Sequence, residues 1–180
     1  MSTTWAACAA MGRKGDERME FWGYYRQDGS VGVRNHVLIL PATRNVNYIC
    51  HRIALAVPGV TTFYTTGEYG RTGGDRKRLA RFLTGIARNP NVANVLLIGM
   101  PHGYGYPEFQ TDALAAEIAR SGKRLEVLNV DRCGGLEGTV TRGIRLAREL
   151  VREATAMRRE AAPLSKLTIG MKCGDSDATS

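Results

Sequence analysis

Residues 36–59, HVLILPATRNVNYICHRIALAVPG, decide the fold. The segment begins with a short apolar run, 36–40, which has the length and composition of a buried β-strand. Residues 47–57 then carry apolar side chains at intervals of three and four, which indicates a helix, and Pro58-Gly59 ends it. The stretch therefore predicts a strand followed by a helix.

The same alternation continues along the chain in both directions. Further strands are predicted at 60–65, 94–98, 125–130 and 167–171, and further helices at 75–88, 111–121 and 139–160. Repeated strand–helix units predict an α/β fold, with helices on both faces of the sheet. We expect three layers around a doubly wound, mostly parallel, Rossmann-like sheet of about five strands. Turn residues within 21–34 predict a hairpin or an irregular lead-in before the first strand.

Bulk composition limits the classes of protein. The chain has 180 residues, enough for one domain, and no apolar run approaches the ~20 residues of a membrane helix. The net charge of +8 favours anionic partners, but the basic stretches alternate with apolar positions, so we interpret them as solvated helix faces and consider nucleic acid disfavoured. The cysteines form no CxxC pair, which argues against a zinc finger and favours free thiols in the cytoplasm.

Unusual side chains follow the predicted strands. Open parallel sheets bind ligands beyond the carboxyl ends of their strands. There, loops combine glycines with ionisable residues; they cover 41–45, 67–75, 99–108, 131–138 and 172–177. A carboxylate substrate would fit such loops, with Arg44, Arg71 or Arg132 as a bidentate partner. Tight turns and solvated arginines explain any single loop better than a site does, so the predicted convergence of the loops is what favours a site.

Two further candidates have structural alternatives. His102 lies between Pro101 and Gly103, where it could be a base, a metal ligand or a solvent-facing side chain. Cys133 precedes Gly134-Gly135 at the start of a predicted helix, where a helix dipole favours a thiolate and exposed amides suit an anion, although a buried inert cysteine is commoner. The chain has no GxGxxG fingerprint, P-loop or GxSxG elbow, which disfavours nucleotide binding.

Four segments resemble motifs of one enzyme family. Residues 21–41, FWGYYRQDGSVGVRNHVLILP, resemble G-Y-x-R-x-D-G-x-V-G-x-R-N, which opens the second domain of the altronate and galactarate dehydratase (UxaA/GarD) family. Residues 89–99 and 133–143 resemble two shorter motifs of that domain. Residues 165–177, SKLTIGMKCGDSD, resemble S-x-L-x-x-G-l-x-C-G-G-S-D, which opens the family's C-terminal domain. The resemblance covers residues 21–180.

The resemblance implies a domain organisation. Residues 1–20 are expected to be a loose tail, 21–163 the second, Rossmann-like domain, and 164–180 the start of a C-terminal catalytic domain, so that the chain is part of a longer protein. The family's small N-terminal domain, of the SAF type, has no counterpart in the chain. In sulfolactate sulfo-lyase that domain is a separate small subunit. We therefore expect such a subunit as a partner, and a homo-oligomer.

The resemblance also implies a reaction: a lyase that removes water from a polyhydroxy carboxylate and gives a 2-keto-3-deoxy acid. It implies a divalent metal, with iron(II) expected, whose ligands the sequence does not assign. The residues expected to be catalytic are Cys173, Asp175, Ser176, Asp177 and His102. Those expected to bind substrate are Arg34, Asn35, Arg44, Arg71, Cys133, Gly134 and Gly135.

Departures from the family motifs leave the substrate open. Residues 44–48 replace the family's N-C-S-A-T-V, 68–71 replace its His and G-C-G, and 99–103 replace G-L-G-C-E, while Asp175 replaces a glycine. One alternative is a sulfo-lyase, which would expel sulfite from a sulfonated hydroxy acid. Another is an anion-binding module or an inactive fragment, and we expect residues 1–180 alone to be inactive.

Overall fold

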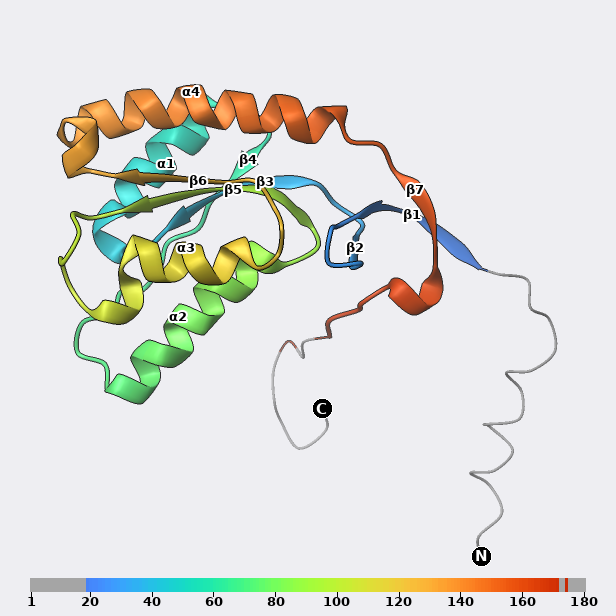
Figure 1. Ribbon diagram of the computed structural model, residues 1–180, viewed down its shortest axis with the longest axis horizontal. Coiled ribbons are helices and arrows are strands. Elements are labelled where there is room, and N and C mark those ends of the chain that lie inside the picture. The colour runs from blue at the N-terminus through green and yellow to red at the C-terminus, as the bar shows by residue number, and fades with distance from the viewer. Residues whose placement is uncertain (1–18, 172–173, 175–180) are drawn as a thin grey trace, which may run out of the picture.

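The structure, a computed structural model, describes residues 19–171 and residue 174. Within this range a parallel sheet lies between two layers of helices, and an antiparallel ribbon lies beyond one edge of the sheet (Figure 1). The strands are β1 (Glu20–Tyr25), β2 (Val31–Gly32), β3 (His36–Pro41), β4 (Val60–Thr61), β5 (Val92–Gly99), β6 (Leu125–Asn129) and β7 (Glu160–Pro163). The α-helices are α1 (Asn47–Ala56), α2 (Gly73–Arg88), α3 (Thr111–Ala119) and α4 (Gly135–Ala156).

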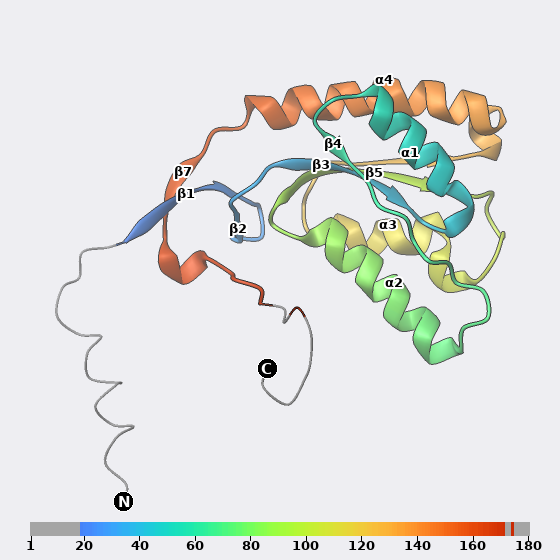
Figure 2. The ribbon, with the colours of Figure 1, turned by 180° about the vertical axis from the view of Figure 1, so that it is seen from behind.

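The parallel sheet has the order β4-β3-β5-β6 within the described residues. Every residue of β5 is buried, because helices cover both faces of this central strand. Helices α1 and α4 lie on one face of the sheet, and α2 and α3 lie on the other (Figure 2). Side chains of β3 alternate between the two cores: Ile39 packs toward α1 and α4, whereas Leu38 and Leu40 pack toward α2 and α3. The α/β class is thereby confirmed, and the Rossmann-like classification stays a prediction.

The strand order reverses direction at β3. The chain runs from β3 to β4 on one side, and then crosses to β5 on the other side of β3. Ligand crevices of open α/β sheets lie at such a reversal, outside the carboxyl ends of the two strands concerned. The segments that follow β3 and β5 are therefore the first place to look for a site.

A hairpin precedes the sheet and is attached at the amino ends of the parallel strands, which we call the amino edge. β1 and β2 pair antiparallel, which realises the hairpin expected within 21–34. The buried side chain of Arg26 donates from Nε to the Pro90 carbonyl (2.8 Å) and from Nη2 to Asn35 Oδ1 (2.7 Å). Gly32 lies so close to Pro90 that a Cβ built on it would be 2.1 Å from the Pro90 carbonyl oxygen. The motif residues of this segment thus attach the hairpin to the loop before β5.

The prediction of a fifth strand at 167–171 is wrong, since those residues form no strand. Ile169 and Met171 are 76% and 94% exposed, so their apolar side chains are not buried against a sheet face. Instead β7, four residues that periodicity did not single out, pairs antiparallel with β1. Among the other elements the largest differences are that β4 is shorter than predicted and that α4 begins and ends four residues earlier.

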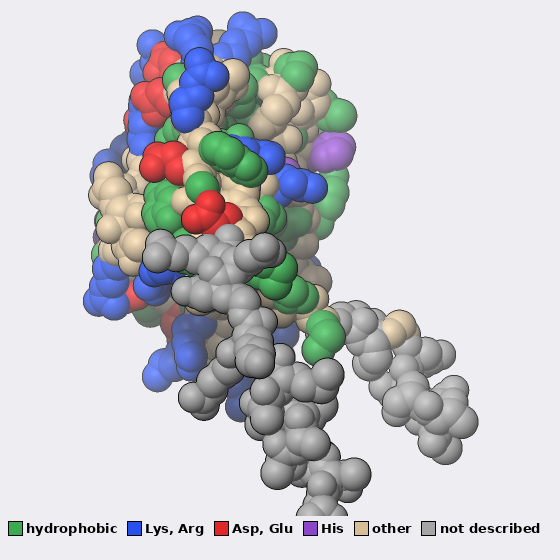
Figure 3. Space-filling view, turned by 90° about the vertical axis from the view of Figure 1, so that its right-hand side faces the viewer, with side chains coloured by type: hydrophobic (Ala, Val, Ile, Leu, Met, Phe, Trp, Pro, Cys, Tyr) green, Lys and Arg blue, Asp and Glu red, His purple; other side chains and the backbone are tan. Residues whose placement is uncertain are grey.

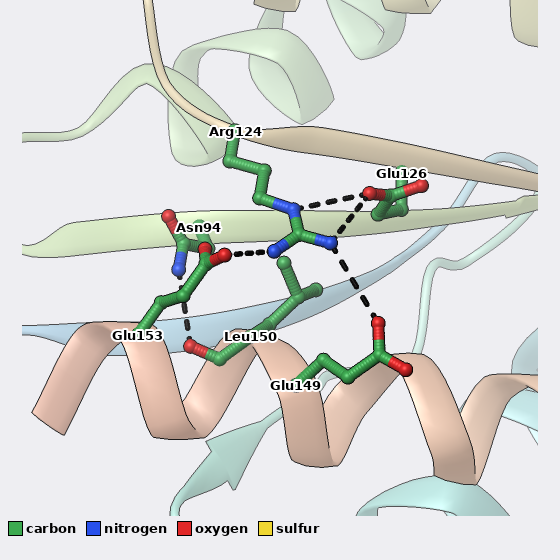
Figure 4. A network of polar contacts seen from close by, with 6 residues as sticks. All are labelled: Asn94, Arg124, Glu126, Glu149, Leu150 and Glu153. Carbon is green, nitrogen blue, oxygen red and sulfur yellow. Dashed lines mark hydrogen bonds and ion pairs between the residues drawn. The ribbon is translucent and has the colours of Figure 1, made fainter.

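Helix α4 is tied to the edge strand β6 by charged side chains (Figure 4). Arg124 contacts Glu126 at 2.9 Å, Glu149 at 3.8 Å and also Glu153. The exposed face of α4 carries further arginines, and Lys and Arg side chains gather at the top of Figure 3, where this helix lies. In the part of the chain that the structure describes, no helix combines the length and apolar character needed to cross a membrane.

Candidate functional site

Four segments with unusual side chains lie at one edge of the parallel sheet. They begin at or just after the last residue of β3, β4, β5 and β6. They cover residues 41–46, 62–72, 99–110 and 130–134, which we call the carboxyl edge. All four strands are parallel, so their carboxyl ends point the same way (Figure 1). The predicted convergence of the glycine-bearing loops on one edge agrees with this geometry.

Three of these segments are in direct contact. Asn45, after β3, donates from Nδ2 to the hydroxyl of Tyr104, after β5, at 3.1 Å, so this hydrogen bond crosses the point where the strand order reverses. Tyr69, after β4, packs against Tyr106 with ring centroids 5.9 Å apart. A hydrogen bond to Tyr104 raises the pKa of Tyr69 above its ordinary value. Phenol groups from two strand ends therefore meet here.

Arg44 and Arg71 both pack against Gly67. A Cβ built on Gly67 would lie 2.6 Å from Arg44 Cδ, and Arg71 donates from Nε to the Gly67 carbonyl at 2.8 Å. The Arg44 guanidinium lies over the Tyr69 ring, 5.4 Å from its centroid. Neither arginine has a carboxylate within ion-pair distance among the described residues. Two exposed arginines thus contact the same glycine, and both have capacity to bind an anion.

A third arginine at this edge is already paired. Arg76 lies 4.1 Å from the centroid of the Tyr106 ring and 3.6 Å from Glu108. Glu108 also lines a hollow of about 400 Å³ between α2 and α3, beside Lys77. Because Glu108 offsets its charge, Arg76 is a weaker candidate for anion binding than Arg44 and Arg71.

Glu68 is a candidate site residue that sequence reasoning missed. Its side chain lies in the loop after β4, only 1% of the residue is exposed, and both carboxylate oxygens lack a hydrogen-bond donor among the described residues. The hydroxyl of Thr43, after the neighbouring strand β3, is also buried and unpaired. Buried polar groups are nearly always hydrogen-bonded, so two such groups at adjacent strand ends call for an explanation. The only signal in the sequence was a carboxylate between two glycines, Gly67 and Gly70.

The predicted site residues after β6 lie at the same edge, but their backbone N–H groups already donate hydrogen bonds within the chain. Cys133, Gly134 and Gly135 donate their backbone N–H groups to the carbonyls of Val130, Asp131 and Val130 respectively. The Cys133 thiol is buried. The three backbone N–H groups stabilise the turn into α4, so they are less available to donate hydrogen bonds to an anion.

The remaining predicted residues are more scattered. His102 is exposed on the loop after β5, with Nδ1 3.5 Å from a carboxylate oxygen of Asp112. Arg34 and Asn35 lie at the opposite, amino edge, where Asn35 donates from Nδ2 to the Ala154 carbonyl at 2.6 Å. The structure therefore does not bring those two together with Arg44 and Arg71. Cys173, Asp175, Ser176 and Asp177 lie outside the described residues.

The metal implied by the family resemblance finds no complete ligand set in this part of the chain. Among residues 19–171 and 174, no three His, Cys, Asp or Glu side chains gather closely enough to hold a metal ion. The unpaired oxygens of Glu68 and Thr43 supply a single carboxylate, which falls short of the ligands that iron(II) sites use. The described residues alone do not fit iron(II).

Comparison with known proteins gives consistent matches. A model of the second domain of the D-galactarate dehydratase/altronate hydrolase family matches residues 23–155. The chain is 36% identical over 162 residues to the (2R)-sulfolactate sulfo-lyase subunit beta of Chromohalobacter salexigens, covering 89% of this chain and 39% of that protein. It is 30% identical over 180 residues to the altronate dehydratase of Bacillus subtilis, covering 92% of this chain and 34% of that enzyme. It is 29% identical over 167 residues to the altronate dehydratase of Escherichia coli, covering 87% of this chain and 32% of that enzyme. The chain thus spans about a third of the length of these relatives.

Proposed function

Because the chain belongs to the D-galactarate dehydratase/altronate hydrolase family, we propose that it forms the α/β part of a lyase that removes water from a polyhydroxy carboxylate. The proton leaves the carbon next to the carboxylate and the hydroxyl leaves the following carbon. The enol that remains rearranges to a 2-keto-3-deoxy acid. Relatives named as lyases and dehydratases support this reaction class.

The observation that carries the proposal is the arginine pair at the carboxyl edge. Arg44 and Arg71 are exposed, pack on the same glycine and face no carboxylate of the described chain. Guanidinium groups bind the substrate carboxylate and stabilise the negative charge that develops on it when the neighbouring proton is removed. Tyr69, whose ring lies beneath the Arg44 guanidinium, and Tyr104, bonded to Asn45, add hydroxyl groups at the same strand ends.

A second candidate is the elimination of sulfite from a sulfonated hydroxy acid. The 36% identity to a sulfo-lyase subunit beta favours it, and two arginines suit a ligand with a carboxylate and a sulfonate. Proton removal at the carbon next to the carboxylate is common to both reactions; only the leaving group differs. Since that relative is named as a subunit, we propose that this chain also works together with a separate small subunit.

Turnover by the full-length protein tests the proposal and separates its two versions. Galactarate, altronate and 3-sulfolactate are offered in parallel, and both keto acid and free sulfite are measured. Keto acid from galactarate or altronate supports dehydration, and sulfite from 3-sulfolactate supports the second candidate. Arg44→Ala and Arg71→Ala should each raise KM about tenfold or more, since each removes a charged hydrogen-bond donor. No product from any of the three acids would contradict the proposed function.

A further inference from the structure

We propose that Glu68 recognises a hydroxyl group of the ligand, so that the carboxyl edge selects hydroxy acids over acids with the same skeleton but no hydroxyl. The inference rests on the proposed function in one respect, which is that the ligand anion binds at Arg44 and Arg71. It adds Glu68 as a specificity-determining residue, and it requires a hydroxyl group on the ligand, which the arginines alone do not select.

The first support is the unusual state of the Glu68 side chain. It is almost completely buried, at 1% exposure, and neither oxygen accepts a hydrogen bond from the described residues. A carboxylate in that state is costly, because burial removes its water and no donor replaces it. A ligand hydroxyl that donates to it would therefore bind strongly, and a ligand without one would leave the carboxylate unpaired.

The second support is the position of Glu68 relative to the arginines. It directly follows Gly67, the glycine against which Arg44 and Arg71 both pack. A ligand whose anionic group lies on the two guanidinium groups brings its next carbon atoms close to this loop. In a hydroxy acid those carbons carry the hydroxyls. The unpaired Thr43 hydroxyl at the neighbouring strand end adds a second polar group to the same region.

The loop also has the means to give a ligand access. Glu68 lies between Gly67 and Gly70, whose φ angles are +90° and +73°. Residues 62–72 form neither strand nor helix. Glycines at positive φ change conformation at low cost, so this turn can move to bring the carboxylate to a ligand. The carboxylate is covered in the free protein and meets the hydroxyl when this turn rearranges around the bound acid.

Binding to the full-length protein provides the test, with matched pairs of ligands. Galactarate is compared with adipate, which has the same six-carbon dicarboxylate skeleton and no hydroxyls, and 3-sulfolactate with 3-sulfopropionate. Dissociation constants are measured by titration calorimetry for the wild type and for Glu68→Leu, which keeps the size and removes both acceptors. Glu68→Gln is the second variant, should the leucine protein fail to fold. Glu137→Gln, an exposed glutamate on α4, is the matched control.

In at least one pair, the wild type should bind the hydroxylated acid about 10- to 100-fold more tightly than its analogue, the range expected for a hydrogen bond to a charged group. Glu68→Leu should abolish that ratio while the affinity for the analogue stays the same, and Glu137→Gln should keep it. Thermal unfolding gives a readout that does not depend on ligands: Glu68→Leu should raise Tm, since it removes two buried oxygens that accept no hydrogen bond from the described residues.

Two outcomes would overturn the inference: a wild type that prefers the hydroxylated acid in neither pair, or a preference that survives Glu68→Leu and Glu68→Gln. Failure of the proposed function looks different. In that case the hydroxyl-dependent binding and its loss in the Glu68 variants remain, but no acid is turned over.

Discussion

Replacing Arg26 by methionine should weaken the fold far more than the same change at Arg34, eight residues along the same motif. Arg26 is 9% exposed and donates to the Pro90 carbonyl at 2.8 Å, to Asn35 Oδ1 at 2.7 Å and to the Arg34 carbonyl at 3.2 Å. Burial lowers its pKa below the ordinary arginine value, yet the group stays charged. Methionine keeps most of the volume and leaves these three acceptors without their donor.

The size of the effect follows from these bonds. Hydrogen bonds to a charged group contribute ~1.5–3 kcal/mol each, but they share one guanidinium whose release from burial offsets part of the loss. We expect a net loss of about 3 kcal/mol in the free energy of unfolding. For a domain of this size that lowers Tm by roughly 6–12 °C.

Urea unfolding followed by circular dichroism measures the difference. Within the part of the chain that the structure describes, the exposed guanidinium of Arg34 donates only to the neighbouring Val33 carbonyl, at 3.3 Å. Arg34→Met should therefore change the free energy of unfolding by less than about 0.5 kcal/mol. If Arg26→Met and Arg34→Met have equal unfolding midpoints, the hairpin is not fastened through Arg26 and this reasoning is refuted.

Two further predictions concern the same amino edge. Gly32→Ala should lower the free energy of unfolding by about 1–3 kcal/mol, because its Cβ would lie 2.1 Å from the Pro90 carbonyl oxygen. Gly85→Ala, in open space on α2, is the control and should raise the free energy of unfolding by up to about 1 kcal/mol. Equal urea midpoints for the two variants would contradict this. Burial lowers the pKa of Lys123 to about 8 from 10.5, so between these values only the unfolded chain keeps the proton and stability should rise with pH. Lys123→Met should reduce that rise between pH 8 and 10.5, and an unchanged slope of urea midpoint against pH would show that Lys123 is not its source.

Much of the α/β core could be predicted from sequence because its strands are buried on both faces. The run 94–98 is apolar at successive positions, and the structure places it in β5, where every residue is buried. The error came from 167–171, an apolar run that forms no strand and leaves Ile169 exposed. Strand β7 was missed since its pairing with β1 joins residues about 140 positions apart, and periodicity carries no information on such partners.

Part of the candidate site could be predicted from sequence and part could not. The topology rule was sufficient to place Arg44 and Arg71 at one edge, because parallel strands end on the same side. Glu68 could not be found, since its burial depends on how its loop packs against the segment after β3. Family resemblance suggested Arg34 and Asn35 as substrate contacts, but the resemblance carries no spatial information. The structure shows Asn35 bonded to Arg26 and to α4 at the amino edge.

The most direct test of the carboxyl edge as a ligand site is hydrogen–deuterium exchange of the full-length protein, with and without a saturating hydroxy acid, either galactarate or 3-sulfolactate. The account predicts that amide exchange slows together in 41–46, 62–72 and 99–110, and that it does not change at the amino edge in 26–35 and 89–91. Protection confined to the amino edge, or protection of only one of the three strand-end segments, would contradict it.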